Sequence, residues 1–217
     1  MYEQEFLKPI INFIKENKVN TTEVADCLSK TGALKNLKPI VNRHFVVGEI
    51  SYIFGHSDTN WPIHEQLINV ENEKIIFIDC TNIKERALFG ELVASFMFKK
   101  LKAIAVITNG LVRDAGELIN LGYPIWCNGF TPEGCYNIKR DLTPDIDILV
   151  KKRKNFLDGS IAVCDDCGVV IIPKKDINKY MYNKLISIEE QEKMWFDCVL
   201  NRGWNTFDTV CLKKYKD

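Results

Sequence analysis

Short apolar segments of strand length alternate with amphipathic segments of helical length through the middle of this chain. The apolar runs KIIFIDC (74–80), AIAVIT (103–108) and YPIWC (123–127) are too short for buried helices and carry many β-branched or aromatic residues. Two helical segments, GELVASFMFKKL (90–101) and AGELINLG (115–122), separate these runs. Helices that alternate with buried strands predict an α/β fold.

The regions on either side of this alternation add further elements. We predict helices at 2–17, 24–30 and 61–70, a strand at 45–54 and a β-hairpin at 160–173. Thr21 and Thr22 are candidate caps for the second of these helices. In the helix at 90–101, which Gly90 opens, the inner side is expected to carry Leu92, Val93, Phe96 and Met97.

The C-terminal half shows weaker periodicity. Ser187 and Glu190 have the spacing of a capping box, which predicts a helix from about 188 to 202. Segment 134–159 is the least regular part of the chain and is predicted to form surface loops. No linker divides the sequence, so we predict a single domain over 1–217 with its core at about 20–175.

The composition is that of a globular chain with balanced charge. Of 217 residues, 46% are hydrophobic, and Lys+Arg and Asp+Glu both number 29. Proteins that bind nucleic acid or anionic membranes in a general way usually carry a basic excess, so we expect neither partner. The one dense basic run, KKRK (151–154), is interpreted as part of a solvated loop.

Neither a secretory signal nor a membrane span is evident. The N-terminus carries acidic residues where a signal peptide would be positive, and no small-residue cleavage site follows. The longest apolar runs are far shorter than a membrane-spanning helix requires. We therefore expect a cytoplasmic protein.

Eight cysteines are most simply interpreted as free thiols, because a chain of this length needs no disulfide staples. Cys164 and Cys167 form a CxxC motif, for which zinc or redox chemistry is the alternative. A zinc site needs two further ligands, and no second motif supplies them. His56, Asp58 and His64 are capable of binding metal, but their spacing is not helical and we interpret them as surface loop residues.

The stretch from Gly90 to Asp114 has the features of a ligand site. A glycine at a helix N-terminus leaves backbone amides free for a carboxylate or phosphate and permits close approach. Arg113 and Asp114 then follow a buried strand, and ligands bind at the carboxyl ends of strands in α/β folds. Arginine offers a cationic fork for a carboxylate or an enolate oxygen, and aspartate offers hard oxygen for Mg²⁺. The alternative is that both are ordinary, mutually compensating turn residues.

Segment 89–132, FGELVASFMFKKLKAIAVITNGLVRDAGELINLGYPIWCNGFTP, resembles the core of the RraA-like family (regulator of ribonuclease E activity A and the related 4-hydroxy-4-methyl-2-oxoglutarate aldolases). AVCDDCGVVIIP (162–173) is similar to the late hairpin of that family. The resemblance implies a swivelling β/β/α domain, here with N- and C-terminal helices, and a homotrimer or hexamer with sites near subunit borders.

The same resemblance implies roles for individual residues. Gly90, Glu91, Leu92 and Val93 would form the substrate loop, whose amides hold the carboxylate of a 2-oxo acid. Arg113 would contact the oxo or enolate oxygen, and Asp114 would bind Mg²⁺, or another divalent cation such as Mn²⁺. Two departures from the family bear on the site: one extra residue separates Glu91 from Arg113, and Asn109 replaces a common acidic residue before the turn glycine.

These features predict a metal-dependent lyase of pyruvate-type 2-oxo acids, acting through a metal-stabilised enolate. A 4-hydroxy-2-oxo acid aldolase and an oxaloacetate decarboxylase both fit this description. Aldol cleavage also needs a base for the distal hydroxyl, for which Glu189 or Glu192 of a neighbouring subunit is a candidate. The alternative is a non-catalytic regulator that binds a ribonuclease E-type RNA-degradation complex; such a protein has no need of the Arg113–Asp114 pair.

Overall fold

The computed structural model describes residues 5–216 and has the mixed α/β architecture expected from the sequence. Its α-helices are α1 (Leu7–Asn17), α2 (Thr21–Cys27), α3 (Trp61–Leu67), α4 (Glu91–Lys99), α5 (Ala115–Asn120), α6 (Pro144–Leu157) and α7 (Lys179–Phe196). Its strands are β1 (Ala33–Leu34), β2 (Lys38–Pro39), β3 (Val46–His56), β4 (Ile75–Thr81), β5 (Ala105–Thr108), β6 (Leu111–Val112), β7 (Ile125–Cys127), β8 (Gly129–Phe130), β9 (Ile161–Asp165) and β10 (Gly168–Ile172). Short 3-10 or π-helical turns are η1 (Lys174–Asp176), η2 (Asp197–Asn201), η3 (Phe207–Cys211) and η4 (Lys214–Lys216).

An eight-stranded sheet in the order β1-β10-β9-β3-β4-β5-β7-β2 forms the centre of the molecule. Strands β3, β4, β5 and β7 run parallel, whereas β9, β10, β1 and β2 pair antiparallel with their neighbours. The long strand β3 joins the two parts, because Val46–Glu49 pair with β9 and Ile50–His56 pair with β4. Strands β6 and β8 form a separate two-stranded parallel sheet beyond the ends of β5 and β7.

The sheet curls so that its two edges approach each other. Only residues 35–37 separate the edge strands β1 and β2 in the chain. Across the gap, Nε1 of the fully buried Trp126 on β7 donates a hydrogen bond to the backbone oxygen of Asp165 on β9, at 2.8 Å. The concave interior is filled by Trp126, Leu37 and apolar residues of β3, β4 and β9.

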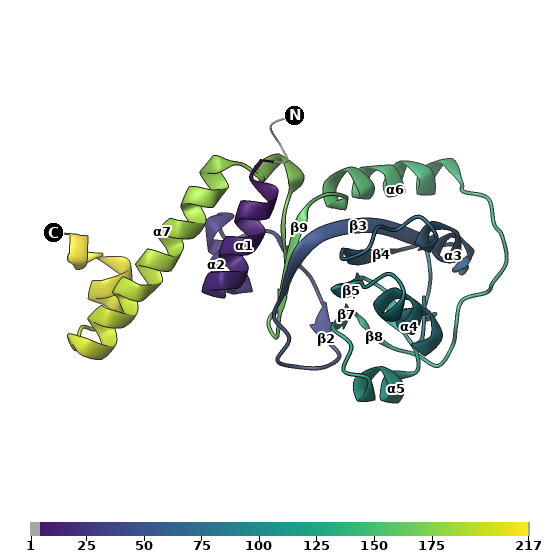
Figure 1. Ribbon diagram of the computed structural model, residues 1–217, viewed down its shortest axis with the longest axis horizontal. Helices are drawn as coiled ribbons and strands as arrows, with labels where there is room; N and C mark the ends of the chain where they lie inside the picture. The colour runs from purple at the N-terminus through teal and green to yellow at the C-terminus, as the bar shows by residue number, and fades with distance from the viewer. Residues whose placement is uncertain (1–4, 217) are drawn as a thin grey trace.

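Helices cover the sheet in three groups (Figure 1). Helices α3, α4 and α5 pack on one face through a core that includes Ile63, Met97 and Leu118. Helix α6 covers the opposite face. Helices α1, α2 and α7 form a third core with β9 and β10, and α7 extends away from the sheet on the side opposite α4.

The predicted loop at 134–159 is wrong, since residues 144–157 form the helix α6. Its buried stripe consists only of Ile146, Val150 and Leu157, which is too narrow to stand out among the surrounding charges. The basic run 151–154 therefore lies on a helix and not in a solvated loop. One of its members, Arg153, pairs with the buried carboxylate of Asp79.

Two helix ends also differ from the prediction. Asn20, and not Thr21 or Thr22, caps α2 and forms a reciprocal capping box with Glu23. The C-terminal helix α7 begins at Lys179 with Asn178 as its cap, well before the predicted start at about 188. Both true caps are asparagines, whose side chains accept hydrogen bonds from first-turn amides.

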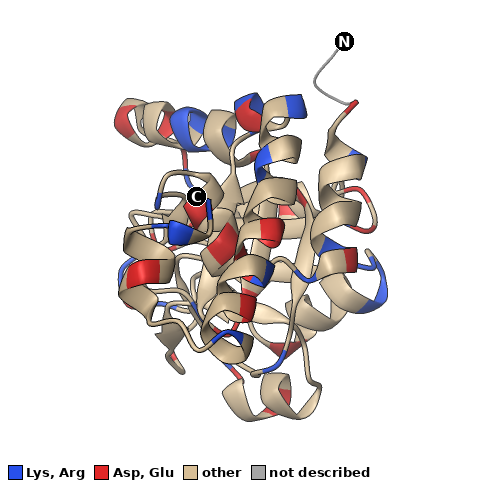
Figure 2. Ribbon diagram, turned by 90° about the vertical axis from the view of Figure 1, so that its left-hand side faces the viewer, with Lys and Arg blue, Asp and Glu red and all other residues tan. Residues whose placement is uncertain are grey.

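Acidic and basic residues are interspersed on the helices of the face shown in Figure 2, where neither sign dominates. Within residues 5–216, no helix combines the length and apolar character that crossing a lipid bilayer requires. All eight cysteines lie in this range and are free thiols, but Cys211, which was expected in apolar surroundings, is exposed. In the CxxC motif, Cys164 is buried and Cys167 is exposed.

Candidate functional site

A small cavity lies beyond the carboxyl ends of β4 and β5, where the loops to α4 and α5 meet. Its volume is about 160 Å³. This size suits a compact acid. The residues that line it include Asn60, His64, Leu88, Gly90, Leu92, Val93, Arg113, Asp114, Gly134 and Asn137. The predicted residues from the two loops therefore border one common space, except Glu91, whose exposed side chain does not line the cavity.

Gly90 and Asp114 are in direct contact. A Cβ atom at Gly90 would lie 2.1 Å from Oδ2 of Asp114 and 2.8 Å from Cγ of Arg113, so only glycine fits at this position. The amide of Glu91 donates a hydrogen bond to the same Oδ2 at 2.9 Å. Asp114 thereby serves as the acceptor that Gly90, the N-cap residue of α4, cannot provide.

Asp114 has a left-handed backbone conformation, with φ 58° and ψ 42°. Aspartate and asparagine tolerate this region better than other non-glycine residues, yet it is sparsely populated and often marks functional sites. Here it turns the chain sharply from β6 into α5 and directs the carboxylate back towards α4.

Backbone pairing and a glycine contact hold Arg113 in place. Its amide donates to the backbone oxygen of Phe89 at 3.0 Å, which ties the two site loops together. Its guanidinium lies against Gly134, where a Cβ would be 2.7 Å from Nη1. Arg86 in turn donates to the backbone oxygen of Gly134 at 3.0 Å and stacks over the Tyr136 ring. The Arg113 side chain is half exposed and able to bind an anion.

The N-terminus of α4 provides free donors. The first-turn amides of Leu92 and Val93 have no acceptor among residues 5–216, as is usual for the first turn of a helix. Together with the helix dipole they favour a negative ligand group.

The predicted inner face of this helix is partly wrong: Met97 is buried, but Leu92 is 84% exposed and Phe96 is 42% exposed. Both border an apolar groove, shared with Ile68, beside the cavity.

The chemistry of Asp114 fits a magnesium-type cation. Its side chain is 41% exposed, and Oδ1 has no hydrogen-bond donor within the described part of the chain. No group of three or more His, Cys, Asp or Glu side chains capable of holding a metal occurs among residues 5–216. A closed zinc centre would need such a group, whereas Mg²⁺ commonly takes one or two carboxylates and completes its shell with water and substrate oxygens.

Asn109 supports the structure next to the site through hydrogen bonds to Asp79 and Cys80 of β4. Its Nδ2 donates to Oδ1 of Asp79 at 2.9 Å, and its Oδ1 accepts from the amide of Cys80 at 2.6 Å. Asp79 is completely buried and also accepts from Tyr52 at 2.6 Å and from Arg153 of α6 at 2.8 Å. Burial, reinforced by the Asp79 carboxylate, raises the pKa of Tyr52, so that its hydroxyl remains a donor at neutral pH.

Sequence reasoning missed some of the residues around the cavity. Asn60 is one, and its only signal was the position before Trp61 and Pro62 at a helix start. His64 is exposed as expected, but it lies on helix α3 and not in a loop, and it lines the cavity. The prediction for His56 is wrong, because this residue is 1% exposed at the end of β3, and burial lowers its pKa.

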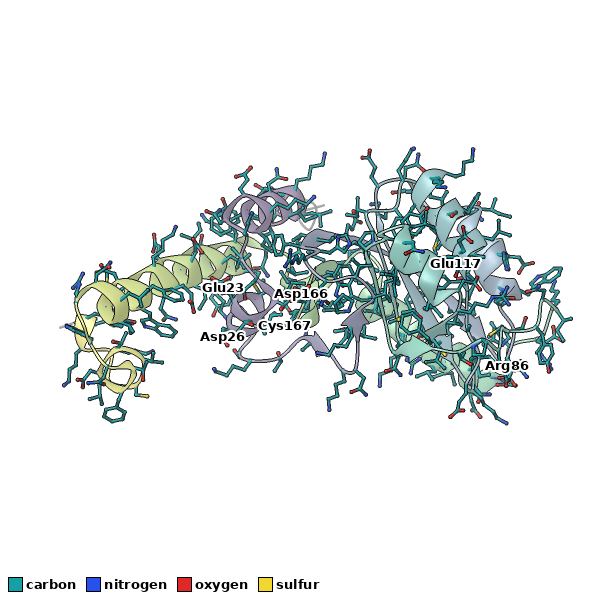
Figure 3. All side chains as sticks on the ribbon, turned by 90° about the horizontal axis from the view of Figure 1, so that it is seen from below. Glu23, Asp26, Arg86, Glu117, Asp166 and Cys167 are labelled. Carbon is teal, nitrogen blue, oxygen red and sulfur yellow. The ribbon has the colours of Figure 1, made fainter. Side chains whose placement is uncertain are left out.

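The candidate bases lie elsewhere in the chain. Glu189 and Glu192 are on α7, near Glu23 of α2. Burial raises the pKa of Glu192, and the carboxylates of Asp26 and Glu189 raise it further. Figure 3 shows Glu23 and Asp26 left of the centre and Arg86, which contacts the site loop, near the right-hand edge. Within a single chain these carboxylates are therefore remote from the cavity.

Comparison with known proteins identifies relatives across most of the chain. A family model described as RraA-like, Aldolase/RraA, matches residues 21–171. A protein of Halalkalibacterium halodurans, whose name assigns it provisionally as a 4-hydroxy-4-methyl-2-oxoglutarate aldolase, is 26% identical over 167 residues, covering 76% of this chain and 78% of its own length.

Solved structures share the fold at lower identity. An uncharacterised protein from Pseudomonas syringae superimposes with a TM-score of 0.70 at 16% identity, covering 95% of this chain and 94% of the other. Streptomyces coelicolor RraAS2, described as an unusual member of the RNase ES inhibitor RraA family, gives 0.63 at 18% identity, covering 84% and 94%. At these identities the likeness concerns the fold alone.

Proposed function

Because the chain belongs to the RraA-like family, whose Aldolase/RraA model spans residues 21–171, we propose that it is a divalent-metal-dependent lyase of pyruvate-type 2-oxo acids. The family contains both aldolases and regulators of ribonuclease E. The observation that carries the proposal is the contact between Asp114 and the N-terminus of α4. It brings a carboxylate, a guanidinium and free helix amides to one small cavity.

Different residues of the cavity would bind different groups of the substrate. The amides of Leu92 and Val93 would bind the carboxylate, and Arg113 would hold the 2-oxo oxygen and the negative charge that develops on it. Oδ1 of Asp114 would hold Mg²⁺ or Mn²⁺. The bound cation would supply Lewis-acid polarisation of the 2-oxo group, which stabilises the enolate of pyruvate as it forms.

In aldol cleavage the proton leaves the C4 hydroxyl, the C3–C4 bond breaks and its electron pair moves towards the C2 oxo group. C4 becomes the carbonyl of one product, and protonation at C3 completes pyruvate. In oxaloacetate the bond to the departing CO₂ breaks in the same way. The chain therefore needs a proton acceptor only for the aldol reaction.

We propose that this base comes from a second copy of the chain in a homotrimer or a pair of trimers. Glu192 is the stronger candidate, because its raised pKa brings it nearer to the working pH of a general base. The exposed apolar residues Ile68, Leu92 and Phe96 beside the cavity are suited to a subunit contact. RraA-like proteins form oligomers, which agrees with this arrangement.

A coupled pyruvate-release assay over oxaloacetate and a panel of 4-hydroxy-2-oxo acids tests the function. We expect turnover of at least one substrate with Mg²⁺, its loss with EDTA and its return with Mn²⁺. Activity that persists in EDTA would show that no metal takes part. No turnover of any substrate, combined with tight association with an RNA-degradation complex, would favour the regulatory alternative.

Gly90→Ala tests the close contact at the site. Its Cβ would overlap Oδ2 of Asp114, so the helix start and the carboxylate must separate. We expect kcat/KM to fall about 100-fold, since displacements near 1 Å in a catalytic geometry have effects of this size. Gly116→Ala is the matched control, because a Cβ there meets no atom within 4 Å. It should keep full activity and gain about 0.5–1 kcal/mol of stability within α5. Equal activities in both variants would contradict the proposed geometry.

A further inference from the structure

Helix α3 brings an imidazole, that of His64, to the wall of the cavity. On this helix Ile63 and Leu67 are buried in the core, so His64 lies at the edge of the buried stripe. The helix is fixed to β3, because Nε2 of Gln66 donates to the backbone oxygen of Phe54 at 2.9 Å. The His64 ring is therefore carried by an anchored element that borders the site.

The ring of His64 makes no polar contact within residues 5–216. Its backbone amide donates to the backbone oxygen of Asn60 at 3.3 Å, but its ring nitrogens form no hydrogen bond or ion pair in this range. His56 differs, since it is 1% exposed and its Nδ1 lies 3.2 Å from the hydroxyl of Ser57. The exposed imidazole of His64 is therefore available to a ligand in the cavity.

The proposed binding of the substrate leaves one of its carbons for the remaining wall of the cavity. C2 of a 2-oxo acid carries three groups in one plane, which are the carboxylate, the oxo oxygen and C3. The amides of Leu92 and Val93 would bind the first group, and Arg113 would bind the second. C3 is left for the rest of the wall, to which α3 contributes His64. His64 also borders the apolar groove together with Leu92 and Val93, so it lies close to the proposed carboxylate site.

Four of the side chains that line the cavity carry an ionisable group: those of His64, Arg113, Asp114 and Cys135. Arginine keeps its proton in proteins, and the Asp114 carboxylate is proposed to hold the cation. Burial raises the pKa of Cys135 to about 12, which makes its thiol a weak acid. Histidine is the residue type that both gains and loses a proton near neutral pH. Within one chain, His64 is the lining residue suited to proton transfer.

We infer that the imidazolium of His64 donates the proton that C3 receives when the enolate becomes pyruvate. This inference rests on the proposed lyase function. The electron pair of the C2–C3 double bond forms the new C3–H bond, the C2 oxo group is restored, and the pair of the broken N–H bond stays on the ring nitrogen. The neutral imidazole then takes a proton from water, to which its exposed ring is open. Aldol cleavage and decarboxylation produce the same enolate, so His64 serves both reactions and the base for the C4 hydroxyl is a separate group.

Pyruvate itself tests this step, because removal and return of a methyl proton involve no cleavage of a C–C bond. Exchange of these protons in D₂O with Mg²⁺, followed by NMR, should occur with the native protein and fall about 100-fold in His64→Gln, as for a lost general acid–base group. Pyruvate release from oxaloacetate should fall by less than about 10-fold, since the enolate can leave the site and take its proton from water. Glu65→Gln, at an exposed neighbour on α3 outside the cavity wall, should leave both rates unchanged.

Binding of pyruvate gives a readout that is independent of turnover. Its dissociation constant, measured from the water-proton relaxation caused by bound Mn²⁺, should stay within about threefold of native in His64→Gln, because a methyl group forms no hydrogen bond with either side chain. Unchanged exchange in His64→Gln, two activities that fall by the same factor, or a dissociation constant that rises as much as exchange falls would overturn the role of His64. A native protein that cleaves oxaloacetate without exchanging methyl protons would do the same. No pyruvate release from any substrate would instead overturn the proposed function.

Discussion

Asp114→Asn should reduce metal-dependent pyruvate release by at least about 100-fold while leaving the thermal stability close to native. Asparagine retains the acceptor for the amide of Glu91 and tolerates the left-handed backbone at this position. It loses the negative charge that a divalent cation requires, and with it the electrostatic stabilisation of the developing enolate. kcat/KM on the substrate turned over fastest, together with the melting temperature, measures both effects.

Asp114→Ala separates the two roles of this carboxylate. It removes the charge, the helix acceptor and the tolerance of positive φ together, so it should lose activity and about 1 kcal/mol or more of stability. Binding of Mn²⁺ in the presence of pyruvate, followed by its paramagnetic relaxation of water protons, gives a readout independent of turnover. If Asp114→Asn still binds Mn²⁺ as the native protein does, the cation sits elsewhere and Asp114 is only a helix cap.

The sequence could predict that the two loops converge, because each loop follows a strand that is evident in the local pattern. Residues 82–89 lead from β4 to Gly90, residues 109–112 lead from β5 to Arg113 and Asp114, and the carboxyl ends of neighbouring parallel strands lie at the same edge of a sheet. Asn60 follows β3, the next strand in the sheet, but it stands in a segment without strand or motif signal. Its place at the cavity depends on the packing of α3 beside Leu88, to whose backbone oxygen Nδ2 of Asn60 donates a hydrogen bond.

Two of the errors, at Leu92 and Phe96 and at Arg153, share one physical origin. Helical periodicity predicts which face of a helix is apolar, but it does not say whether the partner of that face belongs to the same chain. Leu92 and Phe96 fit the pattern of a buried face and are nevertheless exposed. Arg153 is the opposite case. This charged residue was expected to be solvated, but it donates a hydrogen bond to the buried carboxylate of Asp79, which lies 74 positions away in the sequence. Long-range pairing of this kind leaves no trace in local spacing.

Arg153→Met should have the largest effect on stability of any substitution considered for this chain. Asp79 is completely buried and Arg153 donates to both of its oxygens, at 2.8 and 3.1 Å. Tyr52 and Asn109 would still donate to the carboxylate, but its charge would be left without a counterion in the interior. Breaking one side of a buried pair typically costs about 3–5 kcal/mol, and we expect the lower end of this range because the Arg153 side chain is 35% exposed. Urea unfolding at fixed protein concentration measures the loss.

Two comparisons show whether the uncompensated charge of Asp79 causes the loss of stability in Arg153→Met. Lys151→Met removes a neighbouring charge on α6 whose ion pair with Asp147 is exposed, so the free energy of unfolding should change by less than about 0.5 kcal/mol. In the double variant Asp79→Asn with Arg153→Met no uncompensated charge remains, and stability should recover by more than about 1 kcal/mol relative to Arg153→Met. If the double variant is instead less stable than Arg153→Met by the full effect of Asp79→Asn alone, the two side chains are not coupled. The destabilisation would then come from lost packing of the arginine stem against the sheet.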